Sequence, residues 1–244
     1  IAAMFPDDAV SAWKKALIMA SMYALGTLGA FVFGWIFNRT IMPGQTSLMV
    51  LEMPSYKRPS LHHLLLYMLE RAKLFLVRAG TVILGLSILL WAAMTYPKSG
   101  GDASQQIAHS FAGQAGHVLE PLIKPLGFDW KIGIGLIASF AAREVFNSTM
   151  GIIYAVEGGD EDITPLRDSL RAETWADGSP VFTPLVCVSI MVFFVFAMQC
   201  LSTVAVVKRE TNGWKWPLFQ IGYMTCAAYL ASLIVYQGGK LLGF

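Results

Sequence analysis

The chain has 244 residues, of which 55% are hydrophobic and 14% are charged, and its mean hydropathy is +0.56. A soluble domain of this length cannot hide that much apolar surface, so the composition indicates an integral membrane protein. The formal net charge of +2 excludes a strongly basic surface for nucleic acid.

Two uncharged runs are long enough to span a ~30 Å hydrocarbon core as helix. They cover 23 residues from Ala16 to Asn38 and 30 residues from Gly178 to Val207. Small residues such as Gly26 and Gly29 in the first run would let another helix approach closely. We expect apolar units at about Ala16–Phe37, Phe75–Met94, Ile132–Val156, Pro184–Val207 and Pro217–Tyr236.

An amphipathic helix is expected just before the second unit. Ser60 is a potential N-cap after a proline-containing connector, and apolar residues then recur at helical spacing from Leu61 to Ala72. This pattern predicts a helix lying at the membrane surface that continues into the second span.

A second amphipathic helix is expected at about Ser104–Glu120, ended by Pro121. His109 and His117 lie eight residues apart on it, about two turns, which is too far to share one metal ion easily. Solvated or interfacial histidines are therefore favoured over a metal site.

The third unit is interrupted by Arg143 and Glu144 and by a polar cluster at Asn147, Ser148 and Thr149. Charges at membrane depth usually face a cavity or a partner, so we expect a broken or re-entrant helix. Adjacent residues on a helix diverge by about 100°, so at least one member of the charged pair should have a different partner. The alternative is an ion pair that only holds the break in place.

Residues 157–182 are acidic and are expected to form a solvated loop, because the spacing of a calcium-binding loop is absent. In the fourth unit, Cys187, Met191 and Met198 are expected to pack in the core, although sulfur ligands for a metal are the alternative. Cys200 is a better ligand candidate because it lies in a polar patch, MQCLST, within an apolar span.

Basic residues indicate the topology. The connector between the first two spans is rich in Lys and Arg, which predicts a cytoplasmic location. A third unit that crosses the membrane would place Lys208, Arg209 and Lys215 outside, whereas a re-entrant unit would place them inside. The charge bias favours re-entry.

Three stretches resemble the transmembrane part of the ferrous iron transport protein B (FeoB) family. They are LEMPSYKRPSL (51–61), GFDWKIGIGLIASFAAREVFNSTMG (127–151) and FAMQCLSTVAVVKRETNGWKWPLF (196–219). The resemblance covers almost the whole chain. It implies that residues 1–244 are the C-terminal part of a transmembrane permease domain, with a second Gate-type segment at about 75–207. A GTP-binding domain and a first Gate segment would precede Ile1 and are absent from this chain.

The fold implied is all-α, a polytopic membrane helix bundle with one broken or re-entrant helix and an interfacial amphipathic helix. The function implied is transport of ferrous iron across the bacterial inner membrane, dependent on GTP and Mg²⁺ bound by the absent domain. This chain itself is not expected to be an enzyme or to bind a cofactor. Expected partners are the lipid bilayer, the rest of the transporter polypeptide, Fe²⁺ and a small cytoplasmic accessory protein, but no nucleic acid.

The resemblance also implies site residues. Cys200 matches the cysteine of the second Gate segment, and Glu144 with Ser148 matches the basic-Glu-then-Ser pattern of the family. With Asn147 these residues form the candidate transient Fe²⁺ path: Cys200, Glu144, Ser148 and Asn147. Gln199 stands where many relatives carry Pro, which leaves open whether the helix breaks there. A nucleoside or small-solute transporter of Gate type and a non-transporting membrane scaffold are the alternative functions.

Overall fold

The structure is a computed structural model that describes residues 12–41, 60–97, 107–140, 143, 145–154, 164–175, 178–198 and 200–243. Apart from one isolated bridge between Thr174 and Pro180, the regular secondary structure in these ranges is helical, as the all-α class predicts. The elements in chain order are α1 (Ala12–Thr40), α2 (Leu61–Thr95), α4 (Phe111–Ile123), the 3-10 helix η1 (Lys124–Leu126), α5 (Trp130–Ser139), α6 (Val145–Ile153), α7 (Thr164–Ala172), α8 (Pro184–Phe196), α9 (Leu201–Glu210) and α10 (Lys215–Leu241).

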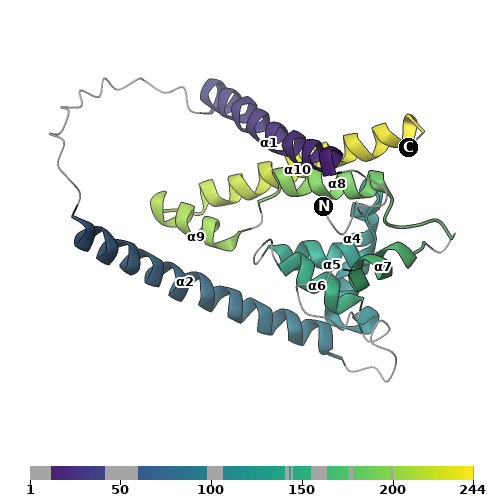
Figure 1. Ribbon diagram of the computed structural model, residues 1–244, viewed down its shortest axis with the longest axis horizontal. Helices are drawn as coiled ribbons and strands as arrows, with labels where there is room; N and C mark the ends of the chain where they lie inside the picture. Colours follow the sequence, from purple (N-terminus) through teal and green to yellow (C-terminus); the bar gives the residue numbers. More distant parts are fainter. Residues whose placement is uncertain are drawn as a thin grey trace.

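Two of the described helices, α1 with 29 residues and α10 with 27, are long and apolar enough to cross a membrane. The expected surface helix and second span form one continuous helix, α2, of 35 residues. The Ser60 side chain accepts a hydrogen bond from the His63 N–H and caps α2, as predicted. Figure 1 shows most of α2 extending away from the other helices, with its C-terminal end near α4.

The buried core lies where α4, α5, α6 and α8 meet. Leu126, Phe128 and Ile132 are fully buried there. Three of these helices begin after a residue whose side chain accepts a hydrogen bond from the backbone N–H three residues further on: Ser110 for α4, Asp129 for α5 and Thr183 for α8. These caps fix where the short helices begin.

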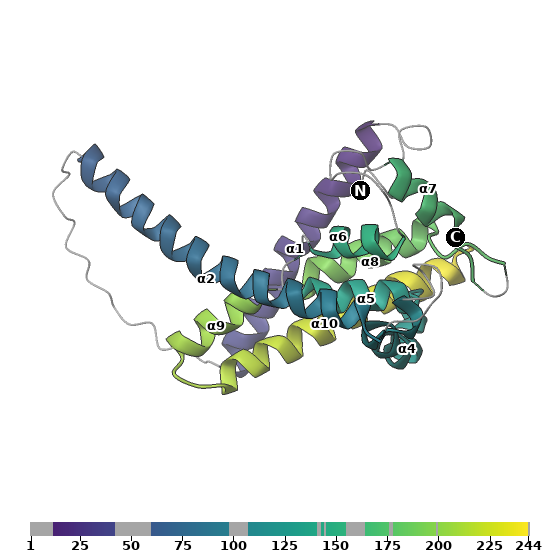
Figure 2. The ribbon, with the colours of Figure 1, turned by 90° about the horizontal axis from the view of Figure 1, so that it is seen from below.

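The helices α8 and α10 lie side by side in both ribbon views (Figures 1 and 2). Ser189 of α8 and Ser232 of α10 are fully buried, and their hydroxyl oxygens lie 2.6 Å apart. The Ser232 hydroxyl is also 3.1 Å from the Ser189 carbonyl oxygen. In a segment surrounded by apolar side chains, this pair joins the two helices at a defined register.

The turn before α5 also packs on α10. Gly127 adopts a left-handed conformation, with φ of 85°, and a Cβ atom added there would lie 2.4 Å from the Tyr236 ring. The Gln237 amide donates to the Pro125 carbonyl oxygen at 2.6 Å. Only glycine combines this φ with so close an approach of the two segments.

Two expected elements differ from the structure. Of the helix expected at 104–120, the structure describes helical residues at 107–109, a bend at Ser110 and then α4, which runs through Pro121 to Ile123, so the predicted end at Pro121 is wrong. A proline in the last turn removes one N–H, and the Lys124 N–H still donates to Glu120. Part of the expected acidic loop forms α7, because Leu170 is buried and anchors a strongly amphipathic helix.

Candidate functional site

The third apolar unit consists of two helices, which confirms the predicted break. The first, α5, ends at Ser139, and α6 begins at Val145, with Arg143 between them. A Cβ atom at Gly135 would lie 2.4 Å from the Met150 methyl carbon and 2.8 Å from the Phe146 ring, so α5 and α6 pack tightly against each other. Whether the unit re-enters the membrane stays a prediction.

The fourth apolar unit is also broken, which answers the question left open by the sequence of whether the helix is interrupted beside Cys200. Helix α8 ends at Phe196 and α9 begins at Leu201. Ala197 and Cys200, which flank the break, have extended backbone conformations, and the Cys200 carbonyl accepts from the Thr203 N–H at 3.1 Å. The break therefore starts just before the MQCLST patch and ends within it, with Cys200 as the N-cap residue of α9.

Arg143 joins the two breaks. Its guanidinium donates hydrogen bonds to the carbonyl oxygens of Phe194 and, at 3.4 Å, Ala197, at the C-terminal end of α8. Carbonyl groups in the last turn of a helix lack partners within the helix and carry partial negative charge. The prediction that one member of the charged pair has a partner elsewhere is confirmed for Arg143.

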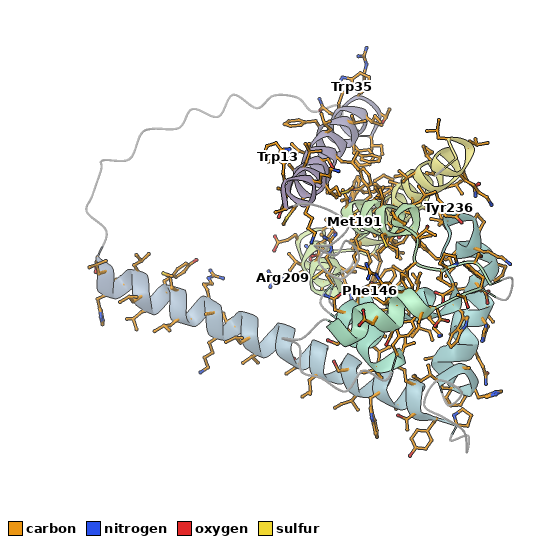
Figure 3. All side chains as sticks on the ribbon, turned by 45° about the vertical axis from the view of Figure 1, so that its right-hand side comes forward. Trp13, Trp35, Phe146, Met191, Arg209 and Tyr236 are labelled. Atoms are coloured by element: carbon orange, nitrogen blue, oxygen red, sulfur yellow. The ribbon has the colours of Figure 1, made fainter. Side chains whose placement is uncertain are left out.

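Aromatic packing supports the same junction. The rings of Phe146 and Phe194 lie 4.9 Å apart at 72°, an edge-to-face contact between α6 and α8. Phe146 projects from α6 on the side of α8 (Figure 3). The start of α6, and with it Arg143, is thus held against the end of α8.

An apolar groove of about 830 Å³ opens beside the junction, between α1 and α8. The groove reaches Arg143 and Phe194, so the guanidinium and one of the two residues whose carbonyl groups it contacts lie at its wall. The other lining residues are mostly apolar, with three methionines and two hydroxyl-bearing side chains: Met19, Met22, Tyr23, Gly26, Thr27, Ala30, Phe31, Met191, Phe194 and Val195.

The predicted site residues are distributed as follows. Glu144 lies outside the described residues. Asn147 and Ser148 lie on the exposed side of α6, whereas Thr149 and Met150 are buried. Cys200 is half-buried at the start of α9, three residues after the carbonyl group that Arg143 contacts. The structure thus brings Cys200 and Arg143 to one junction.

Sequence reasoning missed the backbone carbonyl groups at the end of α8. No side-chain motif encodes them, and only the polar patch around Cys200 marked the region.

The structure places Cys187 and Met198 in the core, where they are 2% and 5% exposed. His117 pairs with Glu120 at 3.2 Å and stacks near Trp130. Among the described residues, no three His, Cys, Asp or Glu side chains are grouped so that they could hold a metal ion.

A charged cluster lies at the N-terminal end of α5, before the predicted third span. Asp129 is 4% exposed and caps α5 by accepting from the Ile132 N–H at 2.8 Å. Burial raises the pKa of Asp129 to about 6, although the hydrogen bond from Ile132 and the charge of Lys131 act in the opposite direction. Lys131 itself pairs with Glu173 at 2.7 Å.

Two family models match the chain. The model described as "Ferrous iron transport protein B C terminus" matches residues 19–71, and the Gate model, described as "Nucleoside recognition", matches residues 76–214. No solved structure is significantly similar to the chain.

Curated relatives match nearly the whole chain. The "Fe(2+) transporter FeoB" of Leptospira biflexa is 43% identical over 94% of the chain and 34% of its own length. The "Fe(2+) transporter FeoB" of Leptospira interrogans serovar copenhageni is 42% identical over 99% of the chain and 36% of its own length. A Porphyromonas gingivalis "Fe(2+) transport protein A/Fe(2+) transporter FeoB fusion protein" is 28% identical over 98% of the chain and 32% of its own length.

The chain spans about a third of the length of these curated relatives. The Gate model covers more than half of the chain, and the adjoining FeoB C-terminus model extends the match toward the N-terminus. With FeoB relatives at 42–43% identity over nearly all its residues, the chain belongs to the Gate-containing FeoB family.

Proposed function

We propose that this chain forms part of a ferrous iron path across the bacterial inner membrane. The observation that carries the proposal is the junction of two broken helices, where Arg143 contacts the carbonyl groups at the end of α8 and Cys200 begins α9. Backbone that leaves the helix at membrane depth is tolerated where it lines a cavity or is buried in protein, and transporters use such ends to hold ions.

The candidate path consists of Cys200, Glu144, Ser148 and Asn147. A thiolate, a carboxylate and neutral oxygen groups together suit a partly dehydrated divalent transition-metal ion. The names of the relatives, "Fe(2+) transporter FeoB", support Fe²⁺ as that ion. The chain contributes the membrane part, in which we place more than one crossing.

We place GTP binding and hydrolysis, with Mg²⁺, in a part of the parent polypeptide outside this chain. The relatives are about three times as long as the chain, which leaves room for such a domain. The Porphyromonas relative carries an Fe(2+) transport protein A segment in the same polypeptide, which supports a small accessory protein as a partner.

Flux measurements on the full-length parent protein in proteoliposomes test the proposal. We expect Cys200→Ser and Glu144→Ala each to reduce Fe²⁺ influx at least about tenfold, as removal of a liganding group does in other metal sites. Cys226→Ser is the matched control, because Cys226 is an exposed cysteine on α10. Equal influx in all three variants and the wild type would contradict the assignment of the path.

Transport of a nucleoside or another small solute is the second candidate, and the description of the Gate model favours it specifically. In that case the polar groups of α6 would face a neutral solute. Competition of the measured flux by Mn²⁺ or by nucleosides separates the two functions. A protein that assembles normally but carries neither solute would instead be a membrane scaffold.

A further inference from the structure

The end of α8 carries more acceptor groups than its own helix can use. In a regular helix the last four carbonyl groups lack partners. The Phe193 carbonyl accepts from the Ala197 N–H at 2.8 Å, which closes the last turn. Among the carbonyl groups that follow, those of Phe194 and Ala197 accept from Arg143.

This end of α8 is a place that attracts positive charge. The helix dipole contributes about half a negative charge there, and the backbone beyond it is extended. In transporters with broken helices, the C-terminal ends of half-helices and unwound carbonyl groups coordinate the transported cation. In this structure the cation at that position belongs to the protein itself.

Arg143 lies at the wall of the groove between α1 and α8 and is not buried in the protein core. Arg143 is exposed, and the groove between α1 and α8 reaches Arg143, Phe194 and Met191. If the guanidinium withdraws, both carbonyl oxygens lose this donor, and that of Phe194 belongs to a residue that lines the groove. Withdrawal means rotation of an exposed side chain, because Arg143 lies in a turn before α6.

We propose that the carbonyl oxygens of Phe194 and Ala197 are ligands of the transported cation, and that Arg143 occupies them as a tethered substitute that must withdraw first. This inference rests on the proposed transport function and adds a regulatory contact to the same junction. Arg143 is a positioning residue that keeps the end of α8 satisfied while the path is empty. It also opposes binding of any divalent cation until it moves.

The expected size of the effect follows from competition. An arginine that occupies the carbonyl groups about nine-tenths of the time weakens the apparent affinity for a metal ion about tenfold. Removing its charge should therefore tighten metal binding by about that factor, whereas most substitutions at a binding site weaken it. The direction of the change is what separates a substitute cation from a structural arginine.

The test uses the full-length parent protein in nanodiscs without nucleotide, with Mn²⁺ as the probe because carbonyl oxygens suit this ion. Free Mn²⁺ is measured by electron paramagnetic resonance. We expect Arg143→Gln to bind Mn²⁺ about tenfold more tightly than the wild type, and Arg143→Lys, which keeps the charge, to remain near it. Arg209→Gln is the control for net charge, because Arg209 is an exposed residue near the end of α9.

Equal or weaker Mn²⁺ binding by Arg143→Gln than by Arg209→Gln would overturn the inference. Arg143→Met serves as a second variant that keeps bulk beside the groove without charge. If neither uncharged variant yields monodisperse protein, the guanidinium is a permanent structural group and the inference is wrong. Fe²⁺ flux by the same wild-type protein, reconstituted into proteoliposomes, separates the two proposals: with flux present, only the substitute cation fails, and without flux or Mn²⁺ binding in any variant, the transport function fails.

Discussion

Asp129 should make the start of α5 sensitive to pH between about 4 and 7. Its carboxyl group is buried and caps the helix through the Ile132 N–H. The pKa of Asp129 rises from 3.8 to about 6 on folding, chiefly because burial disfavours the charged form. At about 1.4 kcal/mol for each pKa unit, the shift corresponds to about 3 kcal/mol.

The sign follows from the raised pKa. Because the folded protein holds the proton more tightly than the unfolded chain, the stabilising contribution is complete below pH 4 and is lost as the pH rises through 6. Asp129→Asn keeps a side-chain oxygen that can accept from Ile132 but does not ionise. We expect this substitution to raise the free energy of local opening at pH 8 by up to about 3 kcal/mol and to have little effect at pH 4.

Hydrogen exchange of the Ile132 and Gly133 amides in the full-length protein measures this opening. After correction for intrinsic exchange, protection in the wild type should fall by up to about 100-fold between pH 4 and pH 8. In Asp129→Asn the protection should stay nearly constant. Glu210→Gln, which removes an exposed carboxyl group of α9, should behave as the wild type does. Parallel pH profiles for the wild type and Asp129→Asn would refute the reasoning.

Two further predictions concern helix contacts, measured by reversible unfolding in mixed micelles. Gly29→Val should destabilise the α1–α8 contact by about 1–3 kcal/mol, because an added Cβ lies 2.5 Å from the Phe196 ring. Gly34→Val is the matched control, since nothing lies within 4 Å of its added Cβ, and equal effects at both positions would contradict the packing. Ser189→Ala should cost about 1 kcal/mol through the loss of its hydroxyl contact with Ser232. A double-mutant cycle with Ser232→Ala should show coupling of at least 0.5 kcal/mol, on the order seen for contacting residues, and strict additivity would exclude the pair as a unit.

The long helices could be predicted from the sequence because their signals are local. A long uncharged run indicates α1. A capping residue, Ser60, followed by apolar residues at helical spacing indicates the start of α2. Arg143 in an apolar stretch likewise indicated a break, because a charge at that depth needs a polar environment. Each of these features depends on residues that are neighbours in the chain.

The break between α8 and α9 could not be predicted in the same way. No Gly or Pro occurs from Ala197 to Cys200, and no charged residue occurs from Gly178 to Val207. What stabilises the end of α8 is Arg143, which precedes Phe194 by 51 residues. A pattern within the fourth unit cannot contain a partner that lies in the third unit. For the same reason the candidate site was assigned to side chains, although the groups at the junction are backbone carbonyls.

The two breaks depend on each other energetically. A helix end at membrane depth leaves carbonyl groups whose lack of partners costs several kcal/mol each, and an isolated arginine there costs roughly 2.5–3.5 kcal/mol on insertion scales. Either feature alone opposes insertion. Together they offset one another, since the guanidinium of Arg143 satisfies carbonyl groups of Phe194 and Ala197. A cation that replaces the guanidinium must therefore supply comparable attraction to the carbonyl groups, and Arg143 must find another polar partner when it leaves. On the proposed exchange, that second partner has to lie within reach of the α5–α6 break, and we expect binding of the ion and rearrangement of the third unit to be coupled.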